Sequence, residues 1–222
     1  MFQVLSVTPV GLEEIQGPLR GLLDCWTELA GRDPIPRIGN LDPRQLGENL
    51  GKTHLVEVMG RGRFRYLLYA REITNPAAQN MSGLTADAFE DASFGRLVVD
   101  NYQHAVDSRR PSCRHVKGLC EDGSSYEYIG LTLPFSSDGQ KVDLLLVGTH
   151  RIAMPEDLTP DRARHDQRYV QELMAETTRC LKLMRGIPDK ALVMAIRQFG
   201  TALLWNIAEM KAAQDAASGK PR

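Results

Sequence analysis

The sequence has few cysteines and no excess of charge of either sign. Its four cysteines, Cys25, Cys113, Cys120 and Cys180, form no C-x-x-C pair and no dense framework. This excludes a disulfide scaffold and indicates reduced thiols in the cytoplasm. The 222 residues carry a formal net charge of -1, so no overall field favours nucleic acid or an anionic membrane. We therefore expect no nucleic-acid partner.

Long hydrophobic segments are also absent. The longest apolar run, Leu144 to Val147, is far too short to cross a bilayer, which takes about 20 apolar residues. Residues 1–10 lack the basic start, the long apolar centre and the cleavage site of a signal peptide. With 42% hydrophobic residues the chain can nevertheless bury a core. We expect a cytoplasmic protein without a membrane partner.

Catalytic and metal-binding motifs are missing as well. No G-x-S-x-G elbow occurs, and Gly47–Thr53 is one residue short of a P-loop and leads into a predicted strand. Cys113 and Cys120 lie seven positions apart on one predicted strand, hence on opposite faces, which argues against a shared metal site. We predict no catalytic residues and no metal ligands, and expect that the protein is not an enzyme.

The pattern that is present begins with a helix and continues with strands. Apolar residues in 17–32 recur every three or four positions, which predicts an amphipathic helix. Period-two patterns and turn signals then predict two strands, short helical turns, one longer helix and three strands. The strands lie at 54–59, 64–70, 112–121, 124–135 and 141–151, and the longer helix at 94–107.

The last of these strands is apolar at nearly every position between Val142 and Val147. A strand that is apolar on both sides is covered on both faces. We therefore expect it at the centre of the sheet. One face would meet the short helices, and the other would meet the helix at 17–32.

From residue 160 onward the pattern is helical. Apolar stripes that start at Tyr169 and Leu192 predict two helices, separated by Gly186 and Pro188. We expect a C-terminal helical hairpin at 160–215. Its apolar faces either pack on each other or build a dimer through a four-helix arrangement, and both alternatives stay open.

Several short motifs accompany this order of elements. They are Trp26, Arg32, Pro36-Arg37, Leu41-Asp42-Pro43, Leu46, Leu50, Phe64-Arg65-Tyr66, Ser82-Gly83, Tyr126-Glu127, Leu133-Pro134 and Asp138-Gly139. Over about residues 19–152 the chain thereby resembles a family of short, mostly stand-alone bacterial PAS proteins. The resemblance implies an α+β fold with a PAS-like five-stranded antiparallel sheet, short helices on one face and an N-terminal covering helix. The domains would be a PAS-like domain at 17–152 and the two-helix extension at 160–215.

The resemblance also implies a sensory or interaction module with a pocket between the sheet and the short helices. Tyr66 on the second strand, and Tyr102 and His104 on the long helix, are the candidate ligand-binding residues. Haem-binding PAS domains carry their proximal histidine on the corresponding helix, so haem is one ligand to consider beside a small apolar molecule. A packed or solvent-facing histidine is the alternative for His104.

The output of such a module would pass to a partner signalling protein or through a homodimer, because no kinase, cyclase or DNA-binding sequence is present. Two other functions remain open. One is a ligand-free structural adaptor with a filled core. The other is a small α+β hydrolase or isomerase, which requires His54 or His115 to face inward beside an acid.

Overall fold

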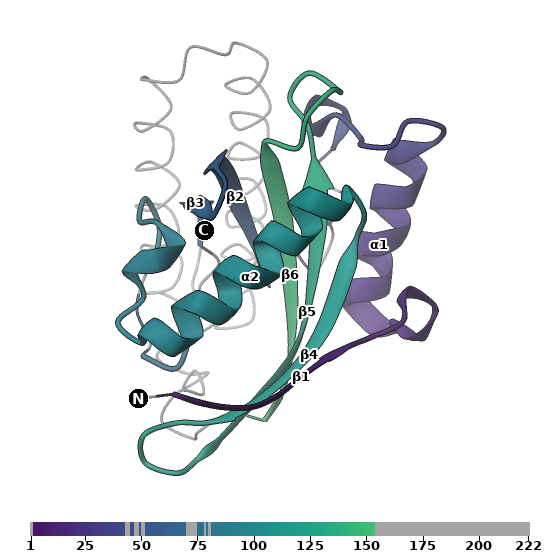
Figure 1. The fold of residues 1–222 in the computed structure, drawn as a ribbon. Helices are drawn as coiled ribbons and strands as arrows, with labels where there is room; N and C mark the ends of the chain where they lie inside the picture. The colour runs from purple at the N-terminus through teal and green to yellow at the C-terminus, as the bar shows by residue number, and fades with distance from the viewer. Residues whose placement is uncertain are drawn as a thin grey trace, which may run out of the picture.

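The computed structural model describes residues 2–153, except 43–44, 47–48, 50–51, 70–74, 78 and 80. Within these residues, six strands form one antiparallel sheet in the order β1-β4-β5-β6-β2-β3 (Figure 1). The strands are β1 (Gln3–Pro9), β2 (Thr53–Gly60), β3 (Arg63–Leu68), β4 (Ser112–Leu119), β5 (Ser125–Phe135) and β6 (Leu144–Ala153). The hairpin predicted at 160–215 lies outside the described residues.

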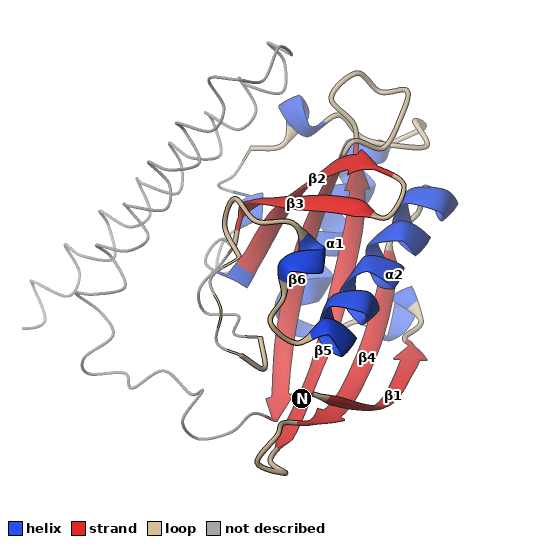
Figure 2. Ribbon diagram, turned by 60° about the vertical axis from the view of Figure 1, so that its left-hand side comes forward, coloured by secondary structure: helices blue, strands red, loops and turns tan. Residues whose placement is uncertain are grey.

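Two α-helices lie on opposite faces of this sheet, α1 (Gly17–Ala30) and α2 (Ala92–Ser108) (Figure 2). Short 3-10 turns η1 (Leu12–Glu14), η2 (Ile38–Asn40) and η4 (Ala86–Ala88) connect the larger elements. Asp91 caps the N-terminus of α2, where its carboxylate accepts hydrogen bonds from the N–H groups of Ser93 and Phe94. Neither α-helix among the described residues combines the length and apolar character needed to cross a membrane.

Strand β6 lies between β5 and β2, which confirms its predicted central position. Leu144 and Leu146 join the core beneath α1, while Leu145 and Val147 join the core beneath α2. The apolar run is therefore explained by burial on both faces. Helix α1 comes close to β6 at Gly148, where an added Cβ would overlap the Leu22 side chain.

The sheet has a sixth strand, β1, where the sequence predicts five strands. Its side chains are mostly exposed, so residues 3–9 show no alternation that would indicate a strand. Backbone pairing with β4, from Gln3 opposite Leu119 to Pro9 opposite Arg114, makes the segment extended. Pairing of this kind depends on a partner more than a hundred residues away in sequence, and the local pattern does not report it.

Phe2 fixes the start of β1 on the face of the sheet that carries α2. Its side chain is 2% exposed and packs edge-to-face against Phe94 and Tyr126, with ring centroids 5.5 and 5.6 Å away. Its N–H donates to the Asp91 carboxylate, and its carbonyl accepts from the Ser93 hydroxyl at 2.6 Å. The start of β1 is thus tied to the residues that begin α2.

Candidate functional site

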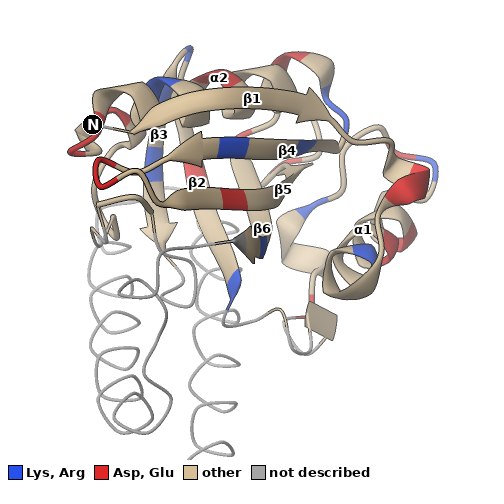
Figure 3. Ribbon diagram, turned by 90° about the horizontal axis from the view of Figure 1, so that it is seen from below, with Lys and Arg blue, Asp and Glu red and all other residues tan. Residues whose placement is uncertain are grey.

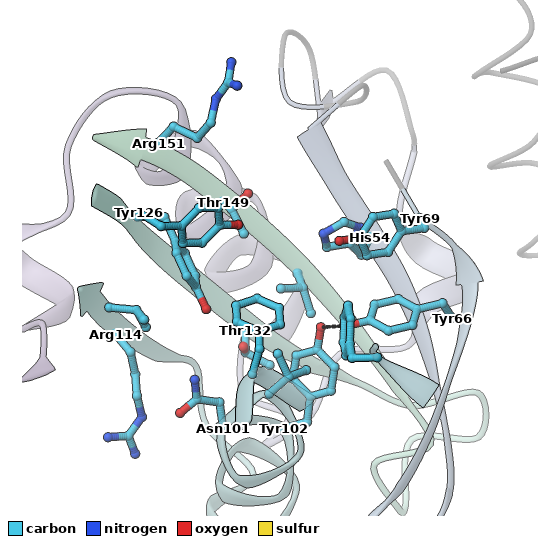
Figure 4. Close-up of a pocket in the computed structure, with 17 residues that line it drawn as sticks. His54, Tyr66, Tyr69, Asn101, Tyr102, Arg114, Tyr126, Thr132, Thr149 and Arg151 are labelled. Atoms are coloured by element: carbon cyan, nitrogen blue, oxygen red, sulfur yellow. Dashed lines mark hydrogen bonds between the residues drawn. The ribbon is translucent and has the colours of Figure 1, made fainter. Parts of the chain in front are cut away.

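A cavity of about 50 Å³ lies between the sheet and α2. Its floor is formed by β2, β4, β5 and β6, and α2 contributes Phe94, Val98, Asn101 and Tyr102. Tyr66 on β3 and Tyr69, which follows β3, close one side. At about 10–15 Å³ for each water-sized group, the free space holds only a few non-hydrogen atoms. Figure 4 shows the side chains around it.

The register of the strands explains why the floor is hollow. Gly130 on β5 pairs with Arg114 on β4 and with Thr149 on β6, so these three residues form one row across the floor. A Cβ at Gly130 would lie 3.2 Å from the Tyr128 ring. Glycine inside a strand often marks such a close approach. Because Gly130 has no side chain, the Tyr128 ring can lie close to this row, and the cavity extends over Gly130 between Arg114 and Thr149.

Hydroxylated rings form the opposite wall of the cavity. The hydroxyl oxygens of Tyr66 and Tyr102 lie 2.9 Å apart and share a hydrogen bond. Tyr69 stacks on His54 with ring centroids 4.2 Å apart, and its hydroxyl accepts a hydrogen bond from Asn75. Burial raises the pKa of Tyr66, Tyr69 and Tyr102 above the ordinary value, so these phenols stay protonated.

His54 on β2 lies at the same end of the cavity as Tyr66 and Tyr69, and it is neutral in the folded protein. It is 3% exposed, and burial lowers its pKa to about 3 because the imidazolium ion would be desolvated. None of the described residues that line the cavity is an aspartate or a glutamate. The described lining residues therefore offer His54 no carboxylate for an acid–base pair.

Polar groups gather at the other end of the cavity. Figure 4 shows Arg114 and Arg151 on the side of the cavity away from Tyr66 and Tyr69, with the Arg151 guanidinium group turned outward. The Arg114 Nε and the Thr149 Oγ1 are buried, and neither has a hydrogen-bond partner among the described residues. An unsatisfied buried polar group costs about 1–3 kcal/mol. An acceptor supplied by a ligand would recover part of that cost.

The structure brings two of the three predicted ligand-binding residues together. Tyr66 and Tyr102 line the cavity and bind each other, although they are 36 positions apart in sequence. His104 is exposed on α2 and is not among the residues that line the cavity. A free space of about 50 Å³ with His104 outside it does not fit a haem group.

Three residues of the cavity floor, Gly130, Arg114 and Thr149, are not among the sequence predictions. The sequence does mark Gly130 as unusual, because it interrupts a row of larger side chains on one face of β5. That row consists of Tyr126, Tyr128 and Thr132. No comparable signal marks Arg114 or Thr149, because only the pairing of the strands places them on either side of Gly130.

His115, the second histidine of the hydrolase hypothesis, does lie beside an acid. Its Nε2 is 2.6 Å from Glu127, and the Lys117 ammonium is 3.0 Å from the same oxygen. The hydrogen bond from Lys117, with a further one from His115, holds the pKa of Glu127 below its usual range. Figure 3 shows the acidic position of β5 beside the basic position of β4. Because β4 side chains alternate, His115 faces away from the cavity that Arg114 and Val116 line.

The cysteines follow the predicted arrangement. Cys113 is buried beneath α1, whereas Cys120 packs against the core beneath α2, so the two lie on opposite faces of the sheet. Burial raises the pKa of the Cys113 thiol to about 11, which suppresses its reactivity. In the described part of the chain, no group of histidine, cysteine or acidic residues has the arrangement of a metal site.

A family model described as a PAS domain matches residues 16–149. The matched stretch contains α1, α2 and every described residue of the cavity lining except Arg151. No curated protein matches the chain.

Proposed function

This chain belongs to the PAS-domain family, and we propose that it is a sensory module that binds a small ligand in the cavity between the sheet and α2. Such domains are in general sensory or interaction modules. The observation that carries ligand binding is the cavity above Gly130, which is walled by aromatic rings and has buried polar groups at one end. Small-molecule sites typically combine an apolar wall with a few placed polar groups.

A bound ligand would act by shifting the population of two arrangements of the domain. Helix α2 is the element best placed to respond, because Val98, Asn101 and Tyr102 line the cavity. The output would pass to a partner signalling protein or through self-association as a homodimer. For that role we propose the helical hairpin at 160–215, separate from the PAS domain at 17–152.

We further propose that the protein works in a reducing compartment such as the cytoplasm and catalyses no reaction itself. Cys25 and Cys113 are free thiols, which suits a reducing compartment. The cavity combines a neutral histidine with protonated phenols and lacks a carboxylate among its described lining residues. This chemistry suits binding better than proton transfer.

Xenon binding tests whether the cavity takes up a guest. Xenon should cause saturable NMR shifts at the methyl groups of Val98 and Val147, which line the cavity. Gly130→Val should abolish these shifts by filling the free space. The matched control is Gly21→Ala on α1, where an added Cβ has no heavy atom within 4 Å, and this variant should retain them.

The same experiment separates sensing from the ligand-free adaptor, which the small free volume favours. No saturable xenon shifts in the wild-type protein, or equal shifts in Gly130→Val, would show that the cavity is not a binding site. In that case the adaptor role replaces the sensory one.

A further inference from the structure

The charged side chains around the cavity are all of one sign. Arg114 and Arg151 line it, and none of the described lining residues carries a carboxylate. His54 adds no charge, because burial keeps it neutral. The Arg114 Nε–H is buried at this cavity, so a negatively charged group beside it would be attracted, whereas a positively charged group would be repelled.

The free hydrogen-bonding capacity of the cavity consists mainly of donors. The Arg114 Nε–H can only donate, and it has no acceptor among the described residues. The Thr149 hydroxyl also has no hydrogen-bond partner among the described residues, and it can donate a hydrogen bond as well. In the Tyr66–Tyr102 pair, one hydroxyl donates to the other, which leaves the second hydrogen available. A guest with oxygen acceptors would match these groups.

The positions of these groups define the shape of the guest. Arg114 and Thr149 flank Gly130 on adjacent strands, at the end of the cavity away from His54 and Tyr69. Aromatic rings and Val147 line the remaining surface. A guest would place its acceptor at the Arg114–Thr149 end and its hydrocarbon part against the rings. The free volume of about 50 Å³ limits the hydrocarbon part to a short chain.

We propose that the cavity binds a compact apolar carboxylate, whose oxygens accept hydrogen bonds from Arg114 Nε–H and the Thr149 hydroxyl. This assignment rests on the proposed ligand-binding function and names the chemical class of the ligand. Hydrogen bonds from an arginine to a carboxylate are about twice as strong as those between neutral groups. The negative charge of the ligand therefore decides which head group is preferred, and the size of its hydrocarbon part decides whether it fits the cavity.

Three probes that differ only in the head group test the assignment: butyrate, 1-butanol and n-butylamine. NMR titration of the full chain should give the tightest binding for butyrate, accompanied by a shift of the Arg114 Nε–H resonance. Arg114→Met should weaken butyrate binding by about tenfold or more, the usual range for a charged hydrogen bond, and leave butanol nearly unchanged. Thr149→Val, which keeps the shape of the side chain, should weaken butyrate binding to a smaller extent.

Lys117→Met is the matched control. It removes a cation from the same strand but from the opposite face of the sheet, where Lys117 pairs with Glu127. Butyrate affinity should stay within about twofold of wild type, since exposed charges act weakly over distance. Thermal melting of every variant checks that the domain is folded.

The possible failures can be told apart. Butanol or butylamine binding as tightly as butyrate, or an Arg114→Met variant with wild-type butyrate affinity, would overturn the carboxylate assignment. Xenon binding without any butyrate binding would also overturn the carboxylate assignment, although the cavity would then still be a binding site. Loss of xenon binding as well would overturn the proposed function itself.

Discussion

His54 should make the stability of this domain fall as the solution becomes acidic. In the folded protein burial lowers its pKa from the ordinary 6.5 to about 3. Between these values the unfolded chain binds a proton that the folded protein excludes. The stabilisation is therefore complete above about pH 6.5, declines as the pH falls, and stops declining near pH 3.

The size of the effect follows from the two pKa values. One unit of pKa difference corresponds to about 1.4 kcal/mol. Between about pH 7 and about pH 4.5 the folded His54 stays neutral while the unfolded histidine becomes fully protonated. The free energy of unfolding should then decrease by roughly 2–3 kcal/mol because of this residue alone.

Urea unfolding of the wild type and His54→Phe, followed by circular dichroism at both pH values, measures this contribution. Phenylalanine keeps a ring stacked on Tyr69, which lies 4.2 Å from the His54 ring, but cannot be protonated. The difference in unfolding free energy between the two proteins should change by roughly 2–3 kcal/mol, because the contributions of the other titrating groups cancel. His104→Gln, a change at an exposed position on α2, should follow the wild type at both pH values. Parallel curves for the wild type and His54→Phe would refute the reasoning.

Two further predictions concern packing on either face of the sheet. Phe2→Ala should lower the unfolding free energy by about 3 kcal/mol, as for other buried phenylalanines. Leu5→Ala, at a side chain that is 56% exposed, should change the unfolding free energy little. Equal effects of the two changes in chemical denaturation would show that β1 is not anchored through Phe2. Gly148→Ala should cost about 1–3 kcal/mol, because the new Cβ overlaps Leu22 and lies 3.1 Å from a Leu19 methyl. Adding Leu22→Ala should make the double variant more stable than the sum of the single changes allows, and strict additivity would contradict the contact.

The candidate site was predictable only where a residue type carried its own signal. The aromatic Tyr66 and Tyr102 stand out on a predicted strand and a predicted helix, and both reach the cavity. Arg114 and Thr149 look like ordinary strand residues. They acquire a meaning only because pairing of β4 and β6 with β5 places both opposite Gly130.

Local patterns in the sequence by themselves determined the α+β class, the amphipathic helix α1 and the buried strand β6, whose apolar run reports burial on both faces. These features were readable because helix and strand periodicity depends on near neighbours in the chain. Only the tertiary structure decided that residues 3–9 add a sixth strand, that Tyr66 and Tyr102 bind each other, and that a hollow remains above Gly130. Each of these depends on contacts between segments far apart in sequence, which no local pattern encodes.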